Sequence, residues 1–262
     1  MKIVACNLGY LLGRHTAWGG YLPSVGGAIF GDRAAETRAV DRFVELVVDE
    51  QPDLIAITEV DRGSARTTTD GQLEVLAGLL TERKRSYAAS AFNKYGSHRL
   101  VGNLPFYRYL SNGVLTSQAY PTQAHYLDHG FKRLVIEVEI EPLDCHVFIV
   151  HLSLRLTTRQ RQLEELASLV NTQAAAKHTI VTGDFNIFTG MDELDTFLDA
   201  SGLIVQNPGP SVQSRTLEDV LGLNQHLDLF VCSPGIRIDR CEVLDVQLSD
   251  HRPIVLDIDP AP

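Results

Sequence analysis

The chain has 262 residues, of which 44% are hydrophobic and 21% are charged, and this composition is typical of a globular protein. Its formal net charge of -10 argues against tight, nonspecific binding of a polyanion over a broad surface, but it does not exclude a local basic groove. No run of 18 apolar residues occurs, so we expect no transmembrane segment, and the N-terminal apolar run is too short for a signal peptide.

The first third of the chain alternates between predicted strands and helices, because continuous apolar runs alternate with apolar residues at three- and four-residue spacing. The predicted elements are a strand over residues 3–8, a helix from 34 to the Gln-Pro stop at 51–52, a buried strand over 54–57 and a helix over 71–80. Residues 9–33 are rich in glycine and aromatic residues and predict a long loop, which is either a functional lid or a flexible insertion.

Residues 83–127 contain no aspartate or glutamate, although the chain has 33 acidic residues. The same window holds Arg83, Lys84, Arg85, Lys94, Arg99 and Arg108. This local reversal of charge predicts a phosphate-facing surface, and Arg99 and Arg108 are candidate substrate contacts. The alternative is an ordinary solvated loop face.

The remaining pattern predicts one α/β domain over residues 1–262, because no fixed-period repeat and no low-complexity linker occurs. The predicted strands are a half-buried strand over 134–140, its hairpin partner over 145–150, and strands over 178–181, 227–232, 236–246 and 254–258. Helices are predicted over 158–176 and 191–200. The strand patterns are of both parallel and hairpin type.

The four cysteines, Cys6, Cys145, Cys232 and Cys241, are widely separated and form no CxxC pair. Each lies in an apolar, strand-like run, so we expect buried free thiols in a reducing compartment and predict a cytoplasmic location. Disulfides in an exported protein are the alternative.

The stretch Val181-Thr182-Gly183-Asp184-Phe185-Asn186 combines a predicted strand end with an acid and an amide two residues apart. We expect Gly183 to break the strand. On an extended segment Asp184 and Asn186 would point the same way, toward one ligand at the strand end. Alone, this motif could equally be a turn that closes a strand.

Other polar residues suited to catalysis also lie at or near predicted strand ends, and the full set is Asn7, Glu59, His151, Asp184, Asn186, Asp228, Asp250 and His251. The oxygen donors among them suit a hard ion such as Mg²⁺, and histidines without a cysteine partner suit acid–base chemistry or phosphate contact. Asp228 lies inside a predicted strand, where a buried carboxylate needs a partner, and a histidine ring is the natural one. Taken singly, each residue also has a purely structural explanation.

The order of these motifs along the chain resembles that of the endonuclease/exonuclease/phosphatase superfamily, which includes pancreatic-type deoxyribonucleases, abasic-site endonucleases, neutral sphingomyelinases and inositol-phosphate 5-phosphatases. The resemblance covers nearly the whole chain and runs through Ala-Cys-Asn7, Ile-Thr-Glu59-Val, Ser-Asn112-Gly-Val-Leu-Thr-Ser, Val-His151-Leu, Gly-Asp184-Phe-Asn186, Leu-Asp228-Leu-Phe and Ser-Asp250-His251-Arg-Pro. It implies an α/β (α+β) four-layer sandwich, with two mixed β-sheets packed face to face and helices outside.

The resemblance also implies a metal site and a place for the substrate. Mg²⁺, or Mn²⁺ as an alternative, would be held mainly by Glu59, with Asn7 and Asp250 completing the site directly or through water. Asn112, in the Ser-Asn-Gly motif, is a candidate substrate-binding residue, whereas Arg99 and Arg108 are candidates from the acid-free window alone.

By the same resemblance, Asp184 would orient or deprotonate the attacking water and Asn186 would hold a phosphate oxygen. His251, paired with Asp228, would act as general base or transition-state stabiliser. His151 would contact the phosphate or protonate the leaving oxygen. Hydrolysis needs an aligned water, charge neutralisation at phosphorus and help for the leaving oxygen, and this set can supply all three.

We therefore predict a Mg²⁺-dependent phosphoesterase that hydrolyses a phosphodiester in nucleic acid, lipid or a small molecule, with no obligate protein partner evident. A phosphomonoesterase and a catalytically inactive binding protein on the same fold are the alternatives. Abasic-site endonucleases tend to carry a tyrosine where this chain has Leu110 and Ser111, and no clear inositol-phosphatase signature is present. The substrate class therefore stays open.

Overall fold

Two six-stranded β-sheets form the centre of the protein in the computed structural model, which describes residues 1–11, 33–64, 70–96, 100–104, 107–173, 178–212 and 226–259. Sheet A contains, in spatial order, β11 (Arg237–Val243), β12 (Ile254–Asp259), β1 (Lys2–Asn7), β2 (Leu54–Asp61), β4 (Leu110–Thr116) and β3 (Ala88–Asn93). Sheet B contains β5 (Thr122–Tyr126), β6 (Leu134–Ile140), β7 (Cys145–His151), β8 (His178–Ile187), β10 (His226–Cys232) and β9 (Ile204–Gln206).

Both sheets are mixed, with one parallel pair in each. The β1–β2 and β7–β8 pairs are parallel, and the other neighbouring strands are antiparallel. β1 lies between β2 and β12, so the strand nearest the N-terminus pairs with the last strand of the described chain, and Ile3 is opposite Leu256.

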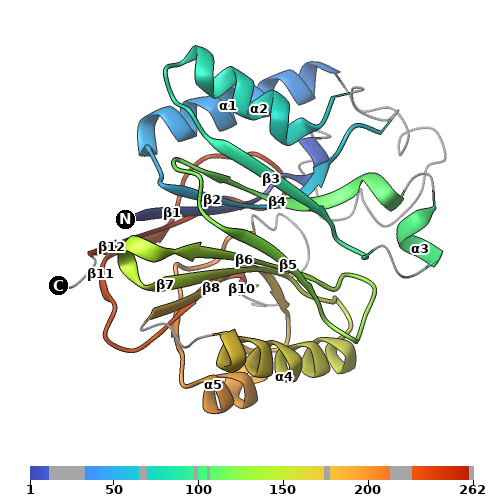
Figure 1. The fold of residues 1–262 in the computed structure, drawn as a ribbon, viewed down its shortest axis with the longest axis vertical. Helices are drawn as coiled ribbons and strands as arrows, with labels where there is room; N and C mark the ends of the chain where they lie inside the picture. The colour runs from blue at the N-terminus through green and yellow to red at the C-terminus, as the bar shows by residue number, and fades with distance from the viewer. Residues whose placement is uncertain are drawn as a thin grey trace, which may run out of the picture.

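The two sheets pack face to face between two layers of helices (Figure 1). α1 (Arg33–Glu50) and α2 (Gln72–Glu82) cover sheet A, whereas α4 (Leu156–Gln173) and α5 (Asp195–Ser201) cover sheet B. Short elements complete the described set: α3 (Leu100–Asn103), η1 (Gly9–Leu11), η2 (Tyr107–Tyr109), η3 (Glu141–Leu143) and η4 (Met191–Leu194). The predicted four-layer sandwich is confirmed.

Successive side chains of each strand point to opposite faces of its sheet, so the buried side chains form three layers of core. In β1, Ile3 and Ala5 face the other sheet, while Val4 and Cys6 pack under α1 and α2. In β7, Ile149 faces the other sheet and Phe148 packs against α4 and α5. Since a strand between two apolar layers is buried on both faces, β1 and β7 lack the polar alternation of a surface strand.

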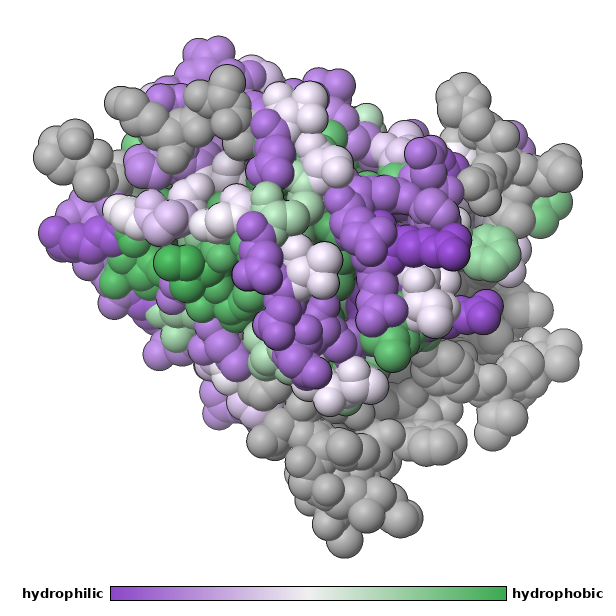
Figure 2. Space-filling model, turned by 90° about the horizontal axis from the view of Figure 1, so that it is seen from below, coloured by the Kyte–Doolittle hydropathy of each residue, from purple (hydrophilic) through white to green (hydrophobic). Residues whose placement is uncertain are grey.

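The solvent side of α4 and α5 is mostly hydrophilic, with one hydrophobic area at the left of the view in Figure 2. No described helix combines the length and apolar composition needed to cross a membrane. Among the described cysteines, Cys6, Cys145 and Cys232 are buried free thiols, as expected, and Cys241 is half-buried and also free.

The structure differs from the sequence predictions mainly in element boundaries. β2 continues to Asp61 and β8 to Ile187, so Glu59 and Gly183 lie inside strands rather than at their ends. Gly183 does not break its strand, because a φ of 122° lets the backbone stay in the ladder while Val150 O lies 2.2 Å from where a Cβ would be. The short elements β3, β5, β9 and α3 were not predicted.

The strand over 134–140 is buried on both faces rather than half-buried. Glu137 is only 5% exposed, and its buried carboxylate has two histidine partners. It lies 2.6 Å from His125 Nε2 and 2.5 Å from His146 Nδ1. Most of the predicted 9–33 loop, residues 12–32, lies outside the described residues, as does Arg99.

Candidate active site

Three of the predicted site residues form one row across sheet B. β8 lies between β7 and β10, and its register places Asp184 opposite both His151 and Asp228. Neighbouring strands are about 4.8 Å apart, so the three side chains are held at fixed, short spacing by backbone pairing alone. All three are at least 98% buried.

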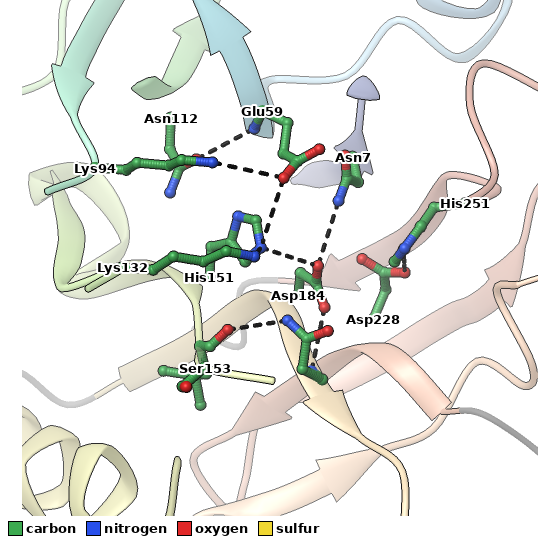
Figure 3. A network of polar contacts seen from close by, with 12 residues as sticks. Asn7, Glu59, Lys94, Asn112, Lys132, His151, Ser153, Asp184, Asp228 and His251 are labelled. Atoms are coloured by element: carbon green, nitrogen blue, oxygen red, sulfur yellow. Dashed lines mark hydrogen bonds and ion pairs between the residues drawn. The ribbon is translucent and has the colours of Figure 1, made fainter. Parts of the chain in front are cut away.

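Sheet A contributes Glu59 and Asn7 to the same centre (Figure 3). Glu59 lies at a β-bulge in β2, where the register with β4 shifts, and its φ is 59°. Asn112 Oδ1 accepts a hydrogen bond from the Glu59 backbone N–H at 3.2 Å. Left-handed backbone at a residue other than glycine costs about 1–3 kcal/mol, so the bulge and Asn112 hold a costly conformation that turns the carboxylate toward sheet B.

Asn7 connects the two sheets at the end of β1. Its Nδ2 donates to Asp184 Oδ2 at 3.3 Å, and its Oδ1 accepts from the Gly9 backbone N–H at 2.9 Å. An amide of this kind fixes the orientation of the carboxylate that it contacts, so Asn7 positions Asp184 across the interface between the sheets.

Asn186 does not extend from β8 in the way that an ideal strand would require. Its φ is 55°, so the chain is not extended at this residue, as the prediction assumed. Its backbone N–H donates to Asp184 Oδ1 at 3.1 Å, and its Nδ2 donates to Leu152 O at 3.0 Å. This leaves Oδ1 as the part of the amide without a described hydrogen bond.

Asp228 and His251 form a buried pair, as predicted from the position of an acid inside a strand. Asp228 Oδ2 lies 2.7 Å from His251 Nδ1 and also accepts a hydrogen bond from Ser211 Oγ at 2.6 Å. Burial lowers the pKa of His251, but the charge and hydrogen bond of Asp228, with Asp184 and Asp250, outweigh burial and raise it to about 10. The ring is therefore an imidazolium at neutral pH.

His151 has the opposite environment. Its Nε2 lies 3.3 Å from Asp184 Oδ2 and also contacts Lys132 Nζ, while its buried Nδ1 has no hydrogen-bond partner among the described residues. Burial, together with the positive charges of Lys132, Lys94 and His251, lowers the pKa of His151 well below its ordinary value. This ring is neutral at neutral pH.

The two carboxylates between the histidines are shifted in opposite directions. Burial raises the pKa of Asp184 to about 7, although the positive charge of His251 opposes the rise. Burial also acts to raise the pKa of Glu59, but the positive charges of Lys94, Lys132 and His251 outweigh it and leave that pKa below its ordinary value. Asp184 can therefore accept a proton near neutral pH, whereas Glu59 stays a carboxylate.

Two lysines at this centre, Lys94 and Lys132, were not predicted as site residues. Lys94 is 3% exposed and its Nζ lies 3.6 Å from Glu59 Oε1. Lys94 was noticed only as part of the acid-free window, and Lys132 lies just beyond that window's end. The one available signal was a basic pair, Lys132-Arg133, directly before a predicted strand.

The remaining predicted substrate contact, Arg108, is not drawn into this network. It is exposed, and its guanidinium contacts the Tyr109 hydroxyl and lies 4.5 Å from the centre of that ring. Arg83, from the same acid-free window, lines a surface groove with Asp41, Glu45 and Glu82 on the helix layer. The window is therefore not one continuous surface, and its member Lys94 lies at this centre.

A buried ion pair supports the loops that follow β7 and β8. Arg159 is 1% exposed, and its Nε donates to Glu193 Oε2 at 2.8 Å. The same guanidinium donates to the carbonyls of Ser153 and Leu154, and Glu193 accepts from the Thr189 backbone N–H at 2.8 Å. These contacts tie the segment after His151 to the segment after Asn186.

The donors around the centre are of the kind that bind a hard cation. One group of three in the described chain, Asp184, Asp228 and His251, has its ligand atoms within 4.8 Å of one another. Asp228 and His251 are already bonded to each other, however, and Glu59 Oε1 reaches within 4.0 Å of His151 Nε2 from the other sheet. Asp250, half-buried beside His251, is not in that group of three.

Comparisons with known proteins agree on one family and one fold. The model of the Endonuclease/Exonuclease/phosphatase family matches residues 17–251. No curated protein matches the chain by sequence.

Among solved structures, an endonuclease/exonuclease/phosphatase family protein from Leptotrichia buccalis aligns with a TM-score of 0.71 and 16% identity over 99% of both chains. The human Nocturnin catalytic domain with bound sulfate anion aligns with a TM-score of 0.65 and 18% identity, over 99% of this chain and 94% of that one. Humanized D. rerio TDP2 aligns with a TM-score of 0.62 and 12% identity, over 99% and 98%. At these identities the structural matches show a shared fold.

Proposed function

The chain belongs to the endonuclease/exonuclease/phosphatase family, and from this premise we propose that it is a Mg²⁺-dependent hydrolase of phosphodiesters. Members of the family are generally metal-dependent phosphoesterases. The observation that carries the proposal is the convergence of Glu59, His151, Asp184 and the Asp228–His251 pair on one buried centre between the sheets. Such a centre combines oxygen donors with proton-transfer groups, which phosphoester hydrolysis requires.

The donor set fits a hard divalent cation, because carboxylate and amide oxygens are the ligands that Mg²⁺ prefers. Glu59 would be the main ligand, and Asn7 and Asp250 would complete the site directly or through water. Mn²⁺ would use the same oxygens. When bound, the ion supplies charge neutralisation at phosphorus and a lowered pKa for water.

The protein groups divide the remaining work. Asp184, whose pKa burial raises to about 7, is suited to orient the attacking water and take its proton. The Asp228–His251 pair presents a fixed positive charge that stabilises negative charge developing on the phosphoryl oxygens. Asn186 would hold a phosphate oxygen through the second hydrogen of its Nδ2, because Oδ1 can only accept, and His151 would contact the phosphate or the leaving oxygen through a ring N–H.

We propose a phosphodiester as the substrate, in nucleic acid, in lipid or in a small molecule. Nucleic acid, lipid and small phosphodiesters all present the same monoanionic group, and a phosphomonoester is the second candidate. The sulfate anion in the Nocturnin structure fits an oxyanion-binding centre on this fold. We further propose one domain for residues 1–262, supported by the core that the two sheets share, and a cytoplasmic location, supported by the free thiols.

The test is a screen of DNA, RNA, sphingomyelin, inositol phosphates and bis-p-nitrophenyl phosphate with Mg²⁺, Mn²⁺ or a chelator. We expect metal-dependent hydrolysis of at least one diester, and a loss of nearly all activity in Glu59→Gln with folding retained. Glu45→Gln, the same substitution on the exposed face of α1, is the matched control. Near-wild-type hydrolysis by Glu59→Gln would contradict the proposal.

A further inference from the structure

The two lysines at the catalytic centre differ in how their charges are balanced. Lys94 is almost fully buried, and its ammonium lies 3.6 Å from Glu59 Oε1 and contacts the Tyr10 hydroxyl. Lys132 is half-buried, and its ammonium contacts the ring nitrogen Nε2 of His151. None of the described carboxylates lies within 4.0 Å of Lys132 Nζ.

From this contrast we propose that Lys132 is a substrate-contacting residue, whose ammonium binds a non-bridging phosphoryl oxygen on the His151 side of the centre. The inference rests on the proposed phosphoesterase function and deepens it. The charge of Lys94 is already paired with Glu59, whereas Lys132 presents a cation to the centre next to a ring that accepts one hydrogen bond. An anionic oxygen is the ligand that such an ammonium lacks.

The backbone of Lys132 is held by a buried clamp on α4. Gln162 is fully buried, and its Nε2 donates to Lys132 O at 2.5 Å and to His129 O at 3.0 Å. Its Oε1 accepts from the Ser153 backbone N–H at 2.8 Å. One amide therefore joins the loop that carries Lys132 to the segment that follows His151.

Two further contacts fix the loop on either side of the clamp. Glu165 Oε2 accepts from the Asp128 backbone N–H at 2.7 Å, and the Arg133 backbone N–H donates to Lys94 O at 2.9 Å. Gly130 has a φ of 89°, and a Cβ there would lie 2.6 Å from Gln162 Nε2. A solvated surface lysine needs no such support, so the loop is built to present Lys132 at one place.

The contact with His151 gives Lys132 a second consequence. An ammonium can only donate, so it uses the lone pair of His151 Nε2 while the two are in contact. A phosphoryl oxygen that draws the ammonium away leaves the Nε2 lone pair free to accept a hydrogen bond from a water molecule or from protonated Asp184, whose Oδ2 lies 3.3 Å from it. Substrate binding at Lys132 therefore releases the histidine nitrogen that faces the reaction.

The experiment compares Lys132→Met and Lys132→Gln with wild type and with Lys84→Met, which removes the same charge from an exposed turn. kcat and KM are measured with bis-p-nitrophenyl phosphate and Mg²⁺, and inorganic phosphate is the competitive inhibitor. We expect both Lys132 variants to lower kcat/KM by about 100-fold and to weaken phosphate inhibition at least about 10-fold, because one charged donor to the phosphoryl group is lost. Lys84→Met should match wild type.

The outcomes separate this inference from the function on which it rests. If wild type hydrolyses no phosphoester, the proposed function fails. If wild type is active and the folded variants keep kcat/KM within about threefold, Lys132 does not contact substrate. A fall in kcat with unchanged phosphate inhibition also overturns the inference, because it would mean that Lys132 acts only through His151.

Discussion

The two sides of the proposed active site hold one histidine each, and these histidines have opposite charge states. His251 lies against Asp228, which accepts a hydrogen bond from the His251 Nδ1–H, and the pKa of His251 rises to about 10. His151 lies against Lys132, and its pKa falls well below the ordinary value. The two rings are nearly equally buried, at 7% and 2% exposure, so burial does not distinguish them.

The difference shows that neighbouring charges decide what a buried histidine does here. Burial alone acts to make both rings neutral, and only the adjacent carboxylate reverses this for His251. One side of the centre therefore presents a fixed cation, and the other a neutral ring beside a separate cation, Lys132. A phosphoryl group between them would meet positive charge from both sides but a proton acceptor from one.

The largest losses of activity are expected when each histidine ring is removed in turn. We expect His251→Ala to lower kcat on the order of 1,000-fold, because it removes the cation and leaves Asp228 buried without its partner. His151→Ala should lower kcat on the order of 100-fold, since Lys132 still supplies charge on that side. Steady-state kinetics with bis-p-nitrophenyl phosphate measures both, with circular dichroism as the check on folding. Equal losses would show that the two sides are equivalent.

Asp228→Asn tests the cause of the asymmetry through stability. A histidine whose folded pKa is raised contributes stability that is complete below its unfolded pKa, near 6.5, and is lost as pH rises toward about 10. Without Asp228 burial dominates, the His251 pKa falls below 6.5, and stability is instead lost on acidification. Because the folded pKa is about 10 and the unfolded value near 6.5, we expect the wild-type advantage in urea unfolding to shrink by about 4 kcal/mol between pH 6 and pH 10.

The control for this measurement is Asp245→Asn, because the Asp245 side chain is 96% exposed and forms only a loose pair with Arg252 at 3.6 Å. Ring-nitrogen NMR titration of His251 gives its pKa directly. A His251 pKa that stays near 10 in Asp228→Asn would show that Asp184 and Asp250 suffice to hold the charge.

The smallest effect is expected at Arg108, which lies outside the network of the centre. Arg108 is exposed and stacked on Tyr109, so it can make only a screened contact with substrate. We expect Arg108→Ala, alone or with Arg99→Ala, to raise KM about threefold at low salt and to have no effect at high salt. Arg83→Ala, on the helix layer, is the control. A KM unchanged at low salt would remove Arg108 from the substrate surface.

Much of the centre was predictable because polar residues recur at the ends of apolar strands or inside them, and their order along the chain resembles that of one family. The pairing of β7, β8 and β10, which was not predicted, then places His151, Asp184 and Asp228 in one row. The Asp228–His251 pair was also predictable, since a carboxylate inside an apolar strand requires a partner. The local sequence pattern therefore identified polar residues that are buried rather than exposed to solvent.

Unusual backbone conformations could not be predicted from the sequence pattern. Glu59 and Asn186 both have positive φ, which neither residue type signals, and the bulge at Glu59 depends on pairing with β4. Gly183 was read as a strand break because glycine usually weakens strands, whereas here it allows close approach to Val150. Lys132 could not be identified from local sequence, because its position depends on Gln162, thirty residues away on another element.

The pairing of β1 with β12 has a consequence for the order of events during synthesis. Leu256, the partner of Ile3, is made about 250 residues after it, which takes roughly 10–50 s at ordinary elongation rates. Until then β1 has one open edge, and the Asn7 carbonyl lacks the Ser249 hydroxyl that donates to it. Sheet B can pair β5, β6, β7 and β8 before this, so the nascent chain should acquire its sheet B half first and its catalytic competence last.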